Sequence, residues 1–364
     1  MFSILVYGFI VFLVYLTVDV ARRTDLGRSR IPVSNILFPL LIIAVILGGR
    51  YEVGTDWPNY KGYYDVIRAN GITGWGLEPL YLLLNAAVAF FDVSSSYFFL
   101  VISLIQFLLV FCYFRHDPKI CAYGMLFFVL CLLPSTLNIV RQSLAICIFI
   151  YSMKYIDKSF FKYFVCIVCA GLFHYSSFIL VLVYLLCSKF FKFLERPSAV
   201  LVLYLVTFLF SHVFIDVILS YVPVDLLGAK YQNNFNNVET QMAVTSGIGI
   251  MINNVLHLAI ICSVPLLKSY EDKARHLMVI YRIFAVGILF NNIFGISEFL
   301  SRVVLPLVSL KVILLPYIVY RLIHTTNILK YVCALALIVI YLGLFFIGVK
   351  NGAGGISPYV FDWL

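Results

Sequence analysis

The segment that decides the fold is LKYVCALALIVIYLGLFFIGV, residues 329–349, in which Lys330 is the one charged residue. An α-helix rises 1.5 Å per residue, so a helix of this length spans roughly 31 Å, close to the thickness of the hydrocarbon core of a bilayer. Apolar and polar residues do not alternate along it, as they would in a strand of an outer-membrane barrel. The segment therefore predicts a transmembrane helix.

Similar segments recur along the chain. Apolar residues make up 63% of the 364 positions and charged residues 12%, against about 25% charged residues in soluble proteins. This composition excludes a soluble fold, whose surface must be polar. We expect an all-α, polytopic transmembrane helical bundle that forms a single membrane domain over 1–364. The expected spans are 2–18, 33–48, 97–114, 120–134, 138–156, 160–173, 176–191, 198–220, 249–267, 275–294, 302–322 and 329–349.

Two features near the N-terminal end bear on the number of spans. The apolar run after Met1 has no basic segment before it and no signal-peptidase site, so we expect a retained helix. The segment PLYLLLNAAVAFF, residues 79–91, is apolar but has the length of a re-entrant or interfacial segment.

The distribution of Lys and Arg predicts the topology, because cytoplasmic loops collect these residues. With twelve crossings, one set of alternating loops holds 17 of the 26 Lys and Arg residues and the other set holds seven. A thirteenth crossing at 79–91 would invert the N-terminal loop relative to the rest. We therefore expect 79–91 not to cross, both termini to be periplasmic, and the long loops 49–78 and 221–248 to be external.

The net charge of +9 does not indicate a nucleic-acid partner, because the basic residues lie in short loops between helices rather than on one solvated face. Cys166 and Cys169 have CxxC spacing, but no second pair or nearby His completes a metal site. We expect no metal.

Three external arginines, Arg50, Arg141 and Arg302, run against the charge bias. Ionisable groups at a membrane are costly and are therefore functional candidates. A guanidinium binds phosphate oxygens through parallel N–H groups, so three of them around one cavity would suit a pyrophosphate. Each could instead snorkel or pair with a carboxylate, as Arg302 could with Glu298 at i, i+4 spacing.

Two other cations fall inside expected spans. Arg282 lies about two turns from a cytoplasmic end, and we expect its side chain to snorkel to the interface. Lys311 lies mid-span, so we expect it to face the interior of the bundle.

Three external residues could take a proton from a reacting hydroxyl: Asp56 in YEVGTDWPNY, Glu78, and His174 in AGLFHYSSF. A lone His among apolar residues is more often packed and hydrogen-bonded than catalytic, although its imidazole can act as a base near neutral pH. The aromatic residues around Asp56, among them Trp57 and Tyr60, are typical of a membrane interface, but sugars also stack on such rings.

Four strings resemble the EpsG family of bacterial membrane proteins, within the wider class of Wzy-type polysaccharide polymerases. They are RYEVGTDWPNY at Arg50–Tyr60, EPLY at Glu78–Tyr81, NIVRQSLA at Asn138–Ala145 and LFHYSS at Leu172–Ser177. The resemblance covers about residues 45–190. In the later half it rests on the helix pattern and on SRVVLPL at Ser301–Leu307.

The resemblance implies a multi-pass enzyme of the bacterial inner membrane that acts at the periplasmic face. It would transfer a growing glycan from polyprenyl pyrophosphate to a lipid-linked repeat unit, with O-antigen as the commonest product. We expect Arg50, Arg141 and Arg302 to bind the pyrophosphate, and Asp56, then Glu78 or His174, to act as base. Tyr60, Trp57 and Gln142 are the expected substrate-binding residues.

The same reaction determines the expected partners. Because guanidinium groups can offset the charge of the leaving pyrophosphate, we expect a metal-independent enzyme without a cofactor. Its partners would be undecaprenyl-pyrophosphate-linked oligosaccharide, membrane lipid and, as a candidate, a chain-length regulator protein.

Three other functions remain open. A flippase for the same lipid-linked unit would need charges along the depth of the bundle, whereas here they gather on one side. A membrane acyltransferase modifying surface sugars would need an embedded His and a cytoplasmic entry for the acyl donor. A scaffold would leave the external Arg and Asp residues unexplained.

Overall fold

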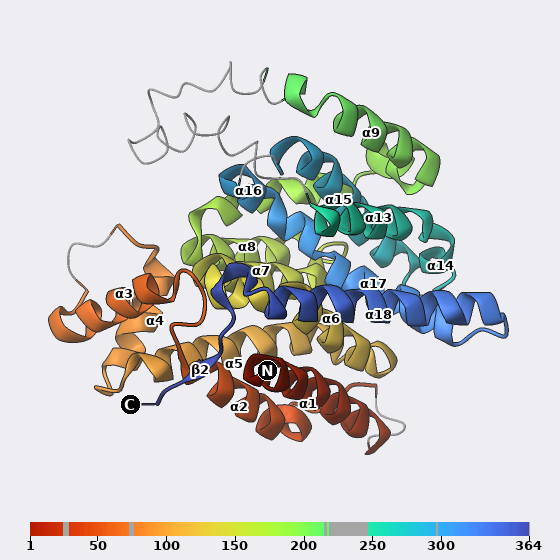
Figure 1. Cartoon of the computed structure of the whole chain (residues 1–364). Helices are drawn as coiled ribbons and strands as arrows, with labels where there is room; N and C mark the ends of the chain where they lie inside the picture. Colours follow the sequence, from red (N-terminus) through yellow and green to blue (C-terminus); the bar gives the residue numbers. More distant parts are fainter. Residues whose placement is uncertain (25–28, 73–75, 215–216, 218–246, 296–297, 364) are drawn as a thin grey trace. The chain divides into compact units, whose positions relative to one another are not determined.

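The computed structural model describes residues 1–24, 29–72, 76–214, 217, 247–295 and 298–363, almost all of them helical (Figure 1). The chain divides into two compact units. The first unit holds Met1–Val181 and Leu315–Leu364, and the second unit holds Leu182–Leu314. Whether they form the single membrane domain that we expect stays a prediction.

The first unit contains most of the long helices. Its elements are α1 (Phe2–Thr24), α2 (Ser34–Gly48), β1 (Arg50–Tyr51), α3 (Trp57–Asn70), α4 (Pro79–Ala89), α5 (Ser95–Phe114), α6 (Pro118–Asn138), α7 (Val140–Ser152), η1 (Met153–Tyr155), α8 (Phe160–Phe173), α18 (Ile328–Lys350), η5 (Ala353–Gly355) and β2 (Val360–Phe361). Helix α5 packs against α2 and α7, and α1 packs against α6 and α18. The Asn327 side chain caps α18 by accepting from the amides of Leu329 and Lys330.

The second unit is built around α15 (Ala274–Phe294). Its other elements are η3 (Lys189–Glu195), α9 (Pro197–Leu209), α13 (Ile248–Cys262), α14 (Val264–Lys268) and α16 (Glu298–Ser309). Helix α15 packs against α9, α14, α16 and η3. Two elements pass from one unit into the other, η2 (Tyr175–Cys187) and α17 (Lys311–Ile323).

The helices confirm a membrane-type, all-α fold. Among the described residues, six helices are long and apolar enough to cross a bilayer: Phe2–Ala21, Ser95–Phe114, Pro118–Asn138, Ala274–Phe294, Leu300–Ile323 and Ile328–Lys350. Each overlaps an expected span. A bent pair, η2 with η3, gives a seventh candidate, and other apolar helices are shorter. Twelve crossings and periplasmic termini therefore stay predictions, and most of the expected loop 221–248 lies outside the described residues.

Helix α4 corresponds to the segment that we expect not to cross. Its 11 residues give a length of roughly 16 Å, about half of the hydrocarbon core. Just beyond its end, the Val93 carbonyl accepts hydrogen bonds from Tyr64 and Arg68 of α3. Helices α3 and α4 also pack against each other, and the short length of α4 favours a re-entrant or interfacial segment.

The residues after α18 return to the first loop as a C-terminal tail (Figure 1, dark blue). Strand β2 in this tail pairs antiparallel with β1, with Arg50 opposite Phe361. The Tyr7 hydroxyl donates to the Ile356 carbonyl, and the Asp362 amide donates to the Gly49 carbonyl. Residues from both ends of the chain therefore hold the first loop in place.

Candidate functional site

One carboxylate in the first unit joins a guanidinium and an imidazole. Glu78 Oε2 accepts from Arg141 Nη1 at 2.6 Å, and Glu78 Oε1 lies 3.2 Å from His174 Nδ1. Glu78 is buried, with 5% of its side chain exposed, whereas Arg141 and His174 expose 24% and 26%. The carboxylate therefore lies at the buried end of the cluster, and the side chains of Arg141 and His174 are partly exposed.

Each of these residues lies at a helix end. Glu78 is the N-cap of α4 in an extended conformation, with Pro79 in the first turn, where no backbone donor is lost. Its negative charge is favourable near a helix N-terminus. Arg141 lies in the first turn of α7, just after the break at Ile139 that ends α6, and His174 is the C-cap of α8. Three short interruptions between helices thus bring the cluster together.

Two tyrosines complete the cluster. The Tyr60 hydroxyl interacts with the Arg141 guanidinium. The centre of that guanidinium lies 5.7 Å from the Tyr81 ring centroid, a cation–π contact. Both rings are buried in an aromatic cluster between α3, α4 and α5. These buried rings lie against Arg141, and the low polarity of their surroundings strengthens its interaction with Glu78.

The charges of the cluster stabilise the ionised Glu78. Burial alone raises the pKa of its carboxyl group, but the hydrogen bond to His174 and the charge of Arg141 outweigh this, so the pKa lies below its ordinary value. Burial raises the pKa of the Tyr60 hydroxyl even though Arg141 opposes the shift. At neutral pH the cluster contains an ionised carboxylate and a neutral phenol.

Three other candidate residues lie in the helices that carry this cluster: Asp56 and Trp57 at the start of α3, and Gln142 in α7. Asp56 is half-buried, begins α3, and lies near enough to Tyr60 to affect its pKa. Trp57 is buried, stacks on Phe99, and donates its indole N–H to the Arg50 carbonyl at 3.0 Å. Gln142 is buried beside Arg141 in the first turn of α7.

Arg50 is enclosed rather than open. Its side chain is 1% exposed, donates through Nη1 to the Leu47 carbonyl at 2.8 Å, and lies over the Phe99 ring at 4.3 Å. Its Nε and Nη2 atoms are buried without a hydrogen-bond partner among the described residues. Burial lowers the pKa of this guanidinium to about 10, so it is charged at neutral pH.

Arg302 belongs to α16 of the second unit and is exposed. The structure therefore brings Glu78, Arg141, His174 and Tyr60 into one cluster, and Arg50 and Trp57 both contact Phe99 of the adjoining aromatic cluster. A shared site for all three arginines stays a prediction.

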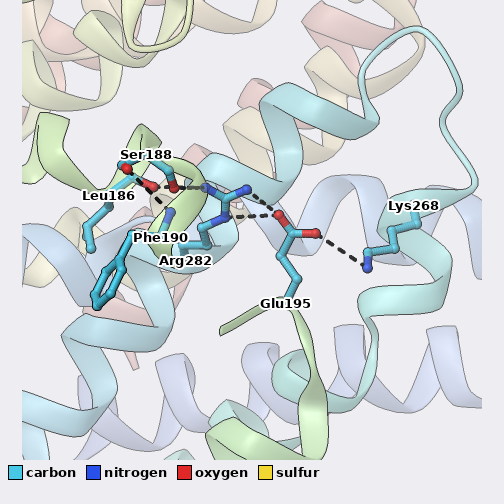
Figure 2. Close-up of polar contacts among 6 residues, drawn as sticks. All are labelled: Leu186, Ser188, Phe190, Glu195, Lys268 and Arg282. Atoms are coloured by element: carbon cyan, nitrogen blue, oxygen red, sulfur yellow. Dashed lines mark hydrogen bonds and ion pairs between the residues drawn. The ribbon is translucent and has the colours of Figure 1, made fainter. Parts of the chain in front are cut away.

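A second ionic cluster lies wholly within the second unit and contradicts the expected snorkelling of Arg282. Arg282 binds the Glu195 carboxylate through Nε at 3.0 Å and through Nη2, and its Nη1 donates to the carbonyls of Leu186 and Ser188 (Figure 2). Lys268 lies 3.4 Å from the other oxygen of Glu195. Arg282 is only 6% exposed, since Glu195, 87 residues away in sequence, satisfies its charge inside the unit.

The family comparison agrees with the sequence resemblance and extends it. The family model described as the EpsG family matches residues 35–361. This chain belongs to the EpsG family. EpsG-type proteins are Wzy-like polymerases, which indicates a surface polysaccharide polymerase-like function. A search of curated proteins and a search of solved structures each returned no match.

Sequence reasoning missed two participants. Tyr81 belongs to EPLY, and its place in the first turn of α4, directly after the N-cap Glu78, is a signal that both lie at the same helix end. Nothing in the sequence around Glu195, apart from its charge, indicated that it pairs with Arg282. Among the described residues, no group of three or more His, Cys, Asp or Glu side chains is arranged to hold a metal ion.

Proposed function

We propose that this chain polymerises lipid-linked repeat units of a surface polysaccharide, of the O-antigen type, at the periplasmic face of the bacterial inner membrane. It transfers the growing glycan from undecaprenyl pyrophosphate to the non-reducing end of a new lipid-linked repeat unit. The observation that supports this best is the Glu78 carboxylate, which holds a partly exposed guanidinium and a partly exposed imidazole side by side.

The reaction breaks one bond and forms another. The bond between the anomeric carbon of the growing glycan and its pyrophosphate oxygen breaks, and the electron pair leaves with the lipid pyrophosphate. A hydroxyl oxygen of the acceptor sugar bonds to the anomeric carbon, and its proton passes to a base. The enzyme must therefore supply positive charge at the leaving group and a proton acceptor near the hydroxyl.

Arg141 supplies the positive charge in this proposal. Only Nη1 is used by Glu78, and about a quarter of the side chain is exposed, so donors remain for phosphate oxygens. Arg50 adds positive charge from beneath, without direct contact, because it is buried. Arg302 remains a third proposed pyrophosphate-binding residue.

His174 is the base that the geometry favours. When Nδ1 donates to Glu78 Oε1, Nε2 carries the lone pair and can accept the hydroxyl proton, while the carboxylate stabilises the imidazolium that forms. Glu78, with its lowered pKa and two partners, is a weak base and serves as a positioning residue. Asp56 remains the alternative base at the start of α3.

The remaining candidates bind or support the sugars. Tyr60 and Gln142 flank Arg141 and are proposed substrate contacts. Trp57 has one ring face on Phe99 and its N–H on a carbonyl, so we propose that it supports Arg50 and the first loop rather than stacking on a sugar.

The main alternative, a flippase, calls for charges that can be exposed to both membrane faces. Arg282 is held within the second unit, because Glu195 and two carbonyls accept hydrogen bonds from its Nε, Nη1 and Nη2 atoms. A cation fixed in this way is unsuited to passing a pyrophosphate along the bundle. This favours the polymerase.

The surface glycan of a deletion strain tests the function. We expect single repeat units on the lipid anchor and no long ladder. The wild-type gene should restore the long ladder, whereas an Arg141→Ala gene expressed at the same level should not. A strain that shows no repeat unit at all would indicate a flippase, and a wild-type ladder would rule out the proposed function.

A further inference from the structure

Asn138 links the two segments that carry the proposed site. It ends α6, one residue before the break that precedes α7. Its Oδ1 accepts hydrogen bonds from the Thr55 amide at 2.6 Å and the Thr55 hydroxyl at 2.9 Å, and its Nδ2 donates to the Pro134 carbonyl at 3.1 Å. One side chain therefore ties the first loop to the turn between α6 and α7, 83 residues away in sequence.

The C-terminal tail closes over the same contact. The Gly54 amide donates to the Gly355 carbonyl at 2.9 Å, and the Thr55 amide also lies 3.3 Å from the Gly354 carbonyl. A Cβ on Gly354 would lie 2.8 Å from Asn138 Nδ2, and a Cβ on Gly54 would lie 2.6 Å from the Leu137 carbonyl oxygen. The first loop, the α6–α7 turn and the tail meet here with almost no side chains between them.

Glycine is required at this meeting point for two reasons. Gly54, Gly354 and Gly355 have positive φ values of 101°, 67° and 67°, in a region that other residues rarely adopt. Their missing side chains also allow the close backbone approach. We call Asn138, Thr55 and these three glycines the clasp.

Two segments connect the clasp to the Glu78 cluster: the start of α3 and the start of α7. Thr55 immediately precedes Asp56, the N-cap of α3, and Tyr60 follows in the next turn, where its hydroxyl interacts with Arg141. Arg141 itself lies three residues after Asn138. Loss of the hydrogen bonds of Asn138 would therefore let α3 shift relative to α7, and would shift the Tyr60 hydroxyl relative to the Arg141 guanidinium.

We propose that Asn138 is a positioning residue of the polymerase, which with the C-terminal tail holds the start of α3 in register with Arg141. The effect of Asn138 on the reaction rate rests on the proposed function. Its effect on the position of α3 rests on the hydrogen bonds alone. A displacement of about 1 Å in a positioned group can reduce a rate about 100-fold.

The test uses the purified full-length chain and three clasp variants. Asn138→Leu removes the acceptor at similar volume, Asn138→Asp keeps it, and Gly354→Ala displaces the tail. Asn253→Leu is the matched control, because the Asn253 amide also donates to the carbonyl four residues earlier, that of Gly249, which lies in the same helix, α13. Gly343→Ala is the control for glycine, since a Cβ there meets nothing within 4 Å.

Hydrogen exchange and steady-state kinetics are the two readouts. For Asn138→Leu and Gly354→Ala, we expect faster exchange of the amides of residues 54–60 and a kcat lowered roughly 10- to 100-fold, with Asn138→Asp restoring most of both. The controls should match the wild type in both measurements. A lowered kcat with a nearly unchanged acceptor KM separates positioning from lost binding.

Two results would overturn the proposal: unchanged exchange at residues 54–60 in Asn138→Leu, or faster exchange with a wild-type kcat. If the wild-type protein forms no polymer, the proposed function fails instead, and the exchange measurement still decides whether Asn138 and the tail hold α3.

Discussion

The two units each contain a Glu–Arg pair with one buried partner, and the pairs differ in how many guanidinium donors they leave available. In the second unit, Glu195 and two carbonyls occupy the guanidinium of Arg282, which is 6% exposed. In the first unit, Glu78 binds Arg141 through one nitrogen, and Arg141 remains 24% exposed. A saturated guanidinium can hold a fold together, whereas one with spare donors at the surface can also bind a ligand.

The location of the pairs reinforces this difference. Arg282 bonds to carbonyls on both sides of Cys187, where η2 meets η3 at a 90° bend, so it satisfies backbone oxygens that the interrupted helix leaves open. Arg141 instead pairs with a carboxylate that is shared with His174. We infer that the Arg141–Glu78 pair takes part in the reaction and that the Arg282–Glu195 pair stabilises the fold.

Replacing Arg141 by Ala should have the largest effect on polymer formation. An arginine that offsets charge on a phosphoryl group can contribute about 10³-fold to a rate, so we expect a loss of that size in a reconstituted assay with lipid-linked repeat units. The thermal unfolding temperature in detergent should also fall, because Glu78 then keeps only His174 of its two partners, so the rate is compared per folded molecule. A rate within a few-fold of the wild type would place Arg141 with Arg282 as a structural residue.

Replacing His174 by Asn should lower the rate about 100-fold, the low end of what a general base contributes. Asp56→Asn, measured in parallel, separates the two candidate bases, because only the true base should remove the acidic limb of the pH–rate profile. An unchanged limb in His174→Asn together with a lost limb in Asp56→Asn would transfer the role to Asp56.

Replacing Glu78 by Gln should have a smaller effect on rate, about 10-fold, and a distinct effect on stability. The folded pKa of Glu78 is lowered, so its ion pair stabilises the protein above the unfolded value near 4.5 and is lost as the pH falls through the folded pKa. The wild-type unfolding temperature should therefore fall between about pH 5 and pH 3 more than that of Glu78→Gln. Parallel curves would contradict a lowered pKa.

Replacing Arg282 by Met should change the rate per folded molecule least, by less than about twofold. Breaking one side of a buried ion pair costs about 3–5 kcal/mol, and we expect the low end because Lys268 remains beside Glu195. The variant should unfold at lower temperature and accumulate less in membranes. A stable variant with a large loss of rate would show that the second pair also acts in the reaction.

The sequence predicted the parts of this account that depend on local composition. Six long apolar helices and the short helix at 79–89 follow from the lengths of the apolar runs. Glu78 and His174 were candidates because ionisable groups are rare in such a chain.

What the sequence could not supply were pairings over long separations. Glu78 meets Arg141 across 63 residues and His174 across 96, and nothing in one sequence indicates which of several carboxylates does so. The same limit led to the wrong expectation for Arg282, whose partner Glu195 lies in a different helix. The burial of Arg50 against Phe99, beside the tail, likewise depends on contacts between segments far apart in the sequence.

Binding of a short prenyl pyrophosphate, compared with the matching monophosphate, tests most directly whether Arg141 meets the leaving group. The wild-type protein and Arg282→Met should prefer the pyrophosphate at least about tenfold, which corresponds to about 1.4 kcal/mol, and Arg141→Ala should lose that preference. An Arg141→Ala protein that keeps the full preference would contradict the assignment of the first pair to pyrophosphate.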